Sequence, residues 1–196
     1  MRACTPILIA ASCLVLAPSA LAASAATTGG AHAGGAVASP TANQTVPPDP
    51  LNGTVPGTKG KIVKGIAYAP ELAPPAVQRA IWAGNKLIGK PYVYGGGHAD
   101  FKEAAGYDCS STVSYALHGG DLLRSPLDSG SFMRWGANGK GRWITIYTNP
   151  GHAFVTIAGL RLDTSAADDP SGKRGPRWRP PISSTSSYVR RHPTGY

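Results

Sequence analysis

Cysteine is scarce in this sequence: three occur in 196 residues, and two of them lie within the first 13 positions. That N-terminal segment has an early arginine, an apolar run over residues 7–16 and then small residues, the pattern of a secretory signal peptide. We expect residues 1–26 to be removed on export, which leaves Cys109 as the only cysteine. A single thiol forms no intramolecular disulfide, so a disulfide-stabilised scaffold is excluded and Cys109 requires another chemical explanation.

The sequence also lacks a long hydrophobic run. The apolar run over residues 7–16 is shorter than the ~20 residues that a membrane-spanning helix needs, and no later run is longer. We therefore expect no transmembrane segment after processing, and a secreted or extracellular protein. Lipidation of Cys13 is the alternative, although the preceding Ala-Ala-Ser is a weak lipidation signal.

Large apolar side chains are almost absent from residues 27–66, which are rich in Gly, Ala, Thr, Pro and Asn. Such a segment buries too little surface to offset the entropy of ordering it, so the sequence predicts a disordered linker there. Residues 67–196 have enough apolar content for one core, and we expect them to form one folded domain.

Acidic residues are few: ten Asp and Glu stand against 19 Lys and Arg, a formal net charge of +9. For an exported protein, this excess suits anionic wall polymers or lipid headgroups, and a solvated basic surface is the alternative. Nucleic acid is not expected, because the arginine-rich stretch over residues 173–179 has no aromatic residue for base stacking apart from Trp178. Trp178 itself fits either a polymer-facing patch or a core anchor. Most of the excess lies late in the chain, in Lys173, Arg174, Arg177, Arg179, Arg190 and Arg191.

Motifs for phosphate binding of the Walker kind and the Gly-x-Ser-x-Gly nucleophile motif are both missing. Metal binding is a weak alternative, because the candidate ligands lack the close paired spacing of a zinc site. No cofactor is therefore expected. The candidate ligands are His98, Asp100, Asp108, His118 and His152.

Hydrophobic periodicity changes along the domain. Apolar residues recur at three- and four-residue steps over residues 75–88 and 110–118, which predicts two helices, with one more helical turn near Phe132. Strand patterns follow, and the polar residues 164–187 are expected to wrap the surface. Helices followed by strands indicate an α+β domain with helices packed on an antiparallel sheet. The predicted strands span residues 143–147, 153–158, 160–164 and 188–190.

Cys109 stands at the predicted start of the second helix, where unpaired backbone N–H groups and the helix dipole favour a thiolate. His152 opens an apolar strand, and Asp163 lies on the next one, so a reversal at residues 159–160 would bring Leu162 or Asp163 back toward the imidazole. Nucleophile, base and orienting carboxylate are the three roles of a catalytic triad. The alternatives are a small buried cysteine, a structural histidine and a turn-capping aspartate.

Three segments in this order resemble the NlpC/P60 family, secreted cysteine peptidases of bacterial cell walls. They are residues 89–96 (Gly-Lys-Pro-Tyr-Val-Tyr-Gly-Gly), 107–110 (Tyr-Asp-Cys-Ser) and 151–159 (Gly-His-Ala-Phe-Val-Thr-Ile-Ala-Gly). The resemblance covers about residues 77–163 and implies a papain-like core. It also implies peptidoglycan or its stem peptides as the partner and a location outside the cell or at the wall.

The resemblance assigns roles to individual residues. It implies that Cys109 is the nucleophile, His152 the base and Asp163 the orienting residue. Tyr92 matches a tyrosine that lies beside the nucleophile and assists the oxyanion. Asp108 and Ser110 match positions that bind the free amine of the stem peptide.

Several positions depart from the family pattern. Ser111 replaces the usual glycine after Asp-Cys-Ser, the orienting residue is commonly histidine rather than Asp163, and residues 141–143 replace a Pro-Gly-Asp run. The loop before Cys109 is longer than usual and carries His98, which we expect to border the substrate cleft. The signal peptide, the candidate triad and the three family-like segments together predict a secreted cysteine endopeptidase that cuts peptidoglycan stem peptides. The alternatives are a thiol acyltransferase or amidase on another substrate, and a non-catalytic wall-binding module.

Overall fold

The computed structural model describes residues 49–196. The predicted signal peptide, the alternative lipidation of Cys13 and the predicted linker over residues 27–48 lie outside the described residues. Within the described part of the chain, no helix is long and apolar enough to cross a membrane.

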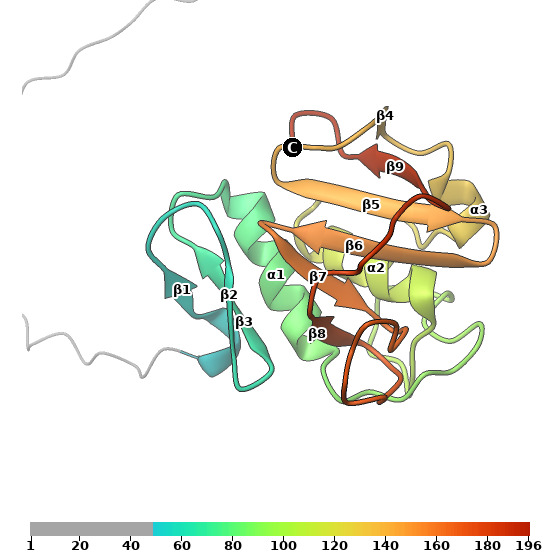
Figure 1. The fold of residues 1–196 in the computed structure, drawn as a ribbon, viewed down its shortest axis with the longest axis horizontal. Coiled ribbons are helices and arrows are strands. Elements are labelled where there is room, and N and C mark those ends of the chain that lie inside the picture. The colour runs from blue at the N-terminus through green and yellow to red at the C-terminus, as the bar shows by residue number, and fades with distance from the viewer. Residues whose placement is uncertain (1–48) are drawn as a thin grey trace, which may run out of the picture. The chain divides into compact units, whose positions relative to one another are not determined.

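A six-stranded antiparallel sheet forms the centre of the described domain, in the strand order β4-β9-β5-β6-β7-β8 (Figure 1). The four predicted strands are confirmed as β5, β6, β7 and β9. Strand β8 lies within residues 164–187, which the sequence predicted only to wrap the surface. The strands are β4 (Ala137–Asn138), β5 (Ile144–Asn149), β6 (His152–Ile157), β7 (Leu160–Asp163), β8 (Arg177–Arg179) and β9 (Val189–His192).

Helices cover one face of this sheet. Both predicted helices are confirmed, as α1 (Pro75–Lys86) and α2 (Cys109–Gly119), and the expected turn near Phe132 is α3 (Ser129–Phe132). Side chains alternate along a strand, so every second residue of β5, β6 and β7 points to the helices and joins their core. Mixed helices and an antiparallel sheet agree with the predicted α+β class. The strand residues in this core are Ile144, Ile146, Ala153, Val155, Ile157, Leu160 and Leu162.

The predicted linker extends too far, because residues 50–66 are ordered. They form a short 3-10 helix, two strands and the start of a third, in a three-stranded sheet of order β1-β3-β2. Contacts with the rest of the domain explain the error: Ala67 and Ala69 are completely buried, and Ile62 packs partly buried against the core. The elements are η1 (Pro50–Asn52), β1 (Thr54–Val55), β2 (Lys61–Val63) and β3 (Ile66–Pro70).

Asn85 in α1 joins three distant segments. Its Oδ1 accepts hydrogen bonds from the Ala67 N–H at 2.9 Å and from Trp178 Nε1 at 2.7 Å, and its Nδ2 donates to the carbonyls of Leu51 and Ala67. Gly84 leaves room for the indole, since a Cβ there would lie 2.8 Å from the ring. Trp178 is therefore a core anchor rather than a polymer-facing patch.

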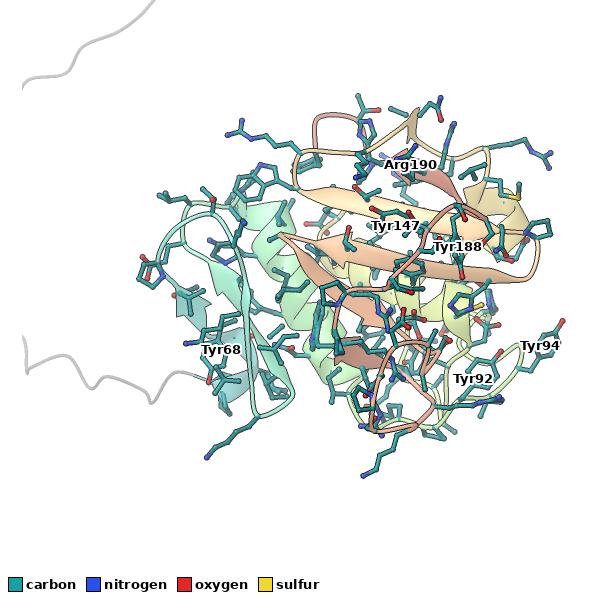
Figure 2. All side chains as sticks on the ribbon, viewed as in Figure 1. Tyr68, Tyr92, Tyr94, Tyr147, Tyr188 and Arg190 are labelled. Atoms are coloured by element: carbon teal, nitrogen blue, oxygen red, sulfur yellow. The ribbon has the colours of Figure 1, made fainter. Side chains whose placement is uncertain are left out.

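The sheet face opposite the helices is polar and aromatic. Tyr147 stacks on Phe154 with ring centroids 4.8 Å apart, and Tyr188 packs edge-on against Phe154, so Tyr147 and Tyr188 lie close together over β5 and β6 (Figure 2). The chain between β8 and β9, which includes Tyr188, crosses the same face (Figure 1). This face also carries the residues that the sequence singles out on β6 and β7.

Candidate active site

Asp108 fixes the start of α2 and so the position of Cys109. Its Oδ1 accepts from the Ser111 N–H at 2.9 Å, while Ser111 Oγ accepts from the Asp108 N–H at 3.0 Å, a reciprocal capping box. Ser111, which departs from the family pattern, is thus a capping residue. Cys109 becomes the first residue of the helix, where backbone N–H groups lack partners within the helix.

The Cys109 thiol lies against His152 at the beginning of β6. Burial raises the pKa of the thiol, but hydrogen bonding from the His152 imidazole and from the Ala153 N–H outweighs burial and lowers it overall. The negative charge of Asp108 opposes this only weakly, because its carboxylate binds backbone N–H groups and His98. The surroundings of Cys109 therefore favour the thiolate.

His152 also contacts Asp163, the last residue of β7. Nε2 of the imidazole lies 2.9 Å from Oδ1 of Asp163, which also accepts from the Ser165 N–H at 2.8 Å. Burial lowers the pKa of His152, but its hydrogen bonds to Asp163 and Cys109 prevail and raise it to about 9. An imidazole with a carboxylate on one side and a thiol on the other can take the proton of the thiol and donate it to a group bound beside the sulfur.

The β6–β7 register explains why the carboxylate reaches the imidazole. Val155 pairs with Leu162, so the two strands run back past each other and Asp163 returns to the His152 end. Asp163 is almost completely buried, with the Arg161 Nε 3.8 Å from its Oδ2. The capping bond to Ser165 is present as well, so the triad geometry and the turn cap coexist at this residue.

Tyr92 borders the site from the loop after α1 (Figure 2). The backbone around it pairs with Tyr107: the Val93 N–H donates to the Tyr107 carbonyl, and the Tyr107 N–H donates to the Pro91 carbonyl, both at 3.1 Å. Because Tyr107 is two residues before Cys109, this pairing places Tyr92 beside the sulfur. Partial burial, followed by the nearby charges of Cys109 and Asp108, raises the pKa of the Tyr92 hydroxyl, so it remains a proton donor at neutral pH.

His98, Asp108 and Ser110 form one polar cluster next to the sulfur. His98 Nε2 lies 3.0 Å from both carboxylate oxygens of Asp108, and Ser110 Oγ lies 3.2 Å from Oδ1 of Asp108. The loop over residues 95–97, three consecutive glycines, packs closely against the start of α2. The Gly95 N–H donates to Asp108, and a Cβ at Gly97 would collide with Tyr107. These hydrogen bonds join the predicted border residue His98 to the two predicted amine-binding residues.

Two clefts open on either side of Tyr92. One, of about 530 Å³, is lined by Tyr92, His152, Ser165 and Arg174 among others, and we call it the His152 cleft. The other, of about 380 Å³, includes Cys109 and the polar cluster, and we call it the Cys109 cleft. Cys109 and His152 thus each line one of two cavities that share Tyr92, an arrangement with room for an extended ligand.

The candidate metal ligands do not converge. Within residues 49–196, no three His, Cys, Asp or Glu side chains are grouped so as to hold a metal ion. His118 stacks on Phe101 at 3.8 Å and contacts the Leu123 carbonyl, which makes it part of the packing. His98 contacts Asp108, whereas His152 contacts Asp163.

Sequence reasoning missed the arginines around the site. No motif or spacing in the sequence linked Arg161 or Arg179 to the site, and Arg179 was counted only among the basic residues of the surface. Both side chains are almost completely buried. Arg174 was counted only as charge, yet it lines the His152 cleft. The alternation of β7 and β8 puts Arg161 and Arg179 on the face of Asp163, but β8 itself was not predicted.

Comparison with known proteins gives no independent assignment: no family model matches the chain, and no curated protein matches it. The function therefore has to be argued from the site.

Proposed function

We propose that this chain is a secreted bacterial cysteine peptidase, similar to the NlpC/P60 family and with a papain-like core, that hydrolyses amide bonds in peptidoglycan stem peptides. One observation carries the proposal: the imidazole of His152 stands between the Cys109 thiol and the Asp163 carboxylate. Thiolate, imidazolium and carboxylate in this order are the components of covalent amide hydrolysis.

The reaction follows from these positions. The Cys109 thiolate attacks the amide carbonyl, and the oxygen gains negative charge facing the N–H groups at the start of α2 and the Tyr92 hydroxyl. Protonated His152 gives its proton to the leaving nitrogen, and the C–N bond breaks to leave a thioester on Cys109. His152, now neutral, takes a proton from water, and the resulting hydroxide cleaves the thioester to a carboxylic acid and the thiolate.

The substrate class rests on the resemblance and on the surface charge. Peptidoglycan stem peptides carry the amines and carboxylates that the polar residues of the two clefts can bind. Lys173, Arg174 and Arg190 are exposed and suit the anionic polymers of a cell wall.

A direct test digests purified peptidoglycan fragments with the protein and analyses the products by mass spectrometry. We expect new amine and acid termini from the wild type and none from Cys109→Ala. Lys64→Gln, at an exposed residue between β2 and β3 that lines neither cleft, is the control and should retain cleavage. Undiminished cleavage by a folded Cys109→Ala variant would contradict the proposal, and transfer to an added amine instead of water would identify an acyltransferase.

A further inference from the structure

The two clefts have different chemical positions relative to the scissile bond. This point rests on the proposed hydrolysis, in which His152 protonates the leaving nitrogen. His152 lines one cleft and Cys109 the other. The leaving amine and the chain attached to it therefore occupy the His152 cleft, and the acyl part occupies the Cys109 cleft.

The clefts also differ in charge. The Cys109 cleft contains Asp108 and Asp128 and no lysine or arginine from the described residues. The His152 cleft contains Arg174 and no aspartate or glutamate from the same part of the chain. Arg174 is close enough to Tyr92 that its charge lowers the pKa of the hydroxyl, against the larger effect of burial.

The backbone on both sides of Arg174 is held by hydrogen bonds from the buried Arg179. Nη2 of the buried Arg179 donates to the carbonyls of Lys173 and Gly175, the two neighbours of Arg174, at 2.8 and 3.0 Å. The Gly175 N–H donates in turn to the Thr164 carbonyl at 3.0 Å. The backbone at Arg174 is thus fixed on both sides, while its side chain stays exposed in the cleft.

A second part of the cleft lining, at Ala167, is held by another buried arginine. Nη2 of Arg161, also buried, donates to the Ala167 carbonyl at 2.6 Å, and Arg179 forms an ion pair with Asp169. Two buried guanidinium groups thereby shape the loop between β7 and β8. Burying charged groups is costly without partners. Arg179 has carbonyls of this loop and Asp169 as partners, whereas Nε and Nη1 of Arg161 make no hydrogen bond to the described residues, and its Nε only faces Asp163 at 3.8 Å.

We propose that the His152 cleft is a subsite for a carboxylate carried by the leaving group, and that Arg174 binds it. A guanidinium offers two parallel N–H donors that match the two oxygens of a carboxylate. The Ser165 and Thr164 side chains line the same cavity and add polar surface. Arg174 would then determine specificity by selecting substrates whose departing half carries an acid.

The test uses synthetic stem peptides made in pairs, with either a carboxylate or a carboxamide at the C-terminus of the leaving half. The wild type should hydrolyse the acid about tenfold faster in kcat/KM, since one charge-assisted contact is worth about 1.4 kcal/mol. Arg174→Gln should bring this ratio close to one, mainly through KM. Lys173→Gln removes a neighbouring charge outside the cleft and should keep the preference.

A charge reversal sharpens the same experiment. Arg174→Glu should prefer a leaving half that ends in an amine, because the sign of the subsite has changed. Equal rates for acid and carboxamide in the wild type, or an acid preference that survives in Arg174→Gln, would overturn the carboxylate subsite while leaving the peptidase proposal intact.

Alkylation of Cys109 provides a readout that does not require peptidase activity. Anionic iodoacetate and neutral iodoacetamide form the same kind of thioether, and intact-mass measurements give their rates. We expect Arg174→Gln to lower the iodoacetate-to-iodoacetamide rate ratio about threefold and Lys173→Gln to leave it unchanged, as for a local attraction screened within about 10 Å. If no stem peptide is cleaved, the proposed function fails, and an unchanged alkylation ratio then overturns the subsite as well.

Discussion

The two faces of the six-stranded sheet differ in what they contribute. The face toward α1 and α2 is built from Ile, Val, Leu and Ala side chains that belong to one core. The opposite face carries His152, Asp163 and the two buried arginines. Neighbouring residues on one strand therefore serve stability and chemistry separately, and β7 shows this most directly with Leu162 and Asp163.

The largest expected effect comes from the polar face, through Asp163→Asn. An amide cannot stabilise the His152 imidazolium as a carboxylate does, so kcat should fall roughly 10⁴-fold, as for the Asp→Asn change in a Ser-His-Asp triad. Stem-peptide hydrolysis measures it, with thermal unfolding as the control for folding. A loss below tenfold would mean that Asp163 acts mainly as the cap of Ser165.

A substitution at the adjacent residue, Leu162, tests the apolar face instead. Leu162→Ala leaves a cavity between β7 and the helices, and the free energy of unfolding should fall by about 3 kcal/mol. Urea denaturation measures this change, and the alkylation rate of Cys109 in the folded fraction should stay close to that of the wild type. A large change in that rate would show that the two faces are coupled.

The pH dependence sharpens the description of the polar face. The pKa of Cys109 is lowered and that of His152 is raised to about 9, so thiolate and imidazolium coexist between the two values. Hydrolysis should rise with pH below the ordinary range of a thiol, remain level, and then fall about tenfold per pH unit above about 9, as the imidazolium loses its proton. A rate that keeps rising through pH 10 would contradict this order of ionisation.

The smallest effect is expected at Thr156, on the polar face of β6 but away from the site. Its Oγ1 makes only a long contact of 3.4 Å to the Thr145 carbonyl. Thr156→Val should change the free energy of unfolding by no more than about 0.5 kcal/mol and should leave hydrolysis unaffected. A measurable loss of hydrolysis here would extend the functional surface beyond His152 and Asp163.

Strong local patterns made part of the fold predictable. The three- and four-residue apolar spacing located α1 and α2, and alternation located β5, β6 and β7. The ordered segment over residues 50–66 was missed because it is held by distant residues, which local composition does not record: Asn85 donates to the Leu51 carbonyl, and the Gly60 N–H donates to the Ala158 carbonyl. Strand β8 was missed because Pro, Ser and Arg surround Trp178, whose partner Asn85 is far away in the sequence.

The residues of the candidate site also fall into a group that the sequence could nominate and a group that only the structure revealed. Cys109, His152 and Asp163 each stood out by type and by position on an element, so the sequence could nominate them. The link between His98 and Asp108 and the location of Arg174 in a cleft depend on loops, whose course no periodicity predicts.

The sequence by itself determined the helix that presents Cys109 and the alternation that puts His152 and Asp163 on one side of their strands, because short-range sterics and burial act on neighbouring residues. Only the tertiary structure decided that the thiol meets the imidazole and that each of them lines one of two oppositely charged clefts. The reason is that these contacts join segments far apart in the chain, and packing and buried hydrogen bonds, such as those of Arg179 and Asn85, bring them together.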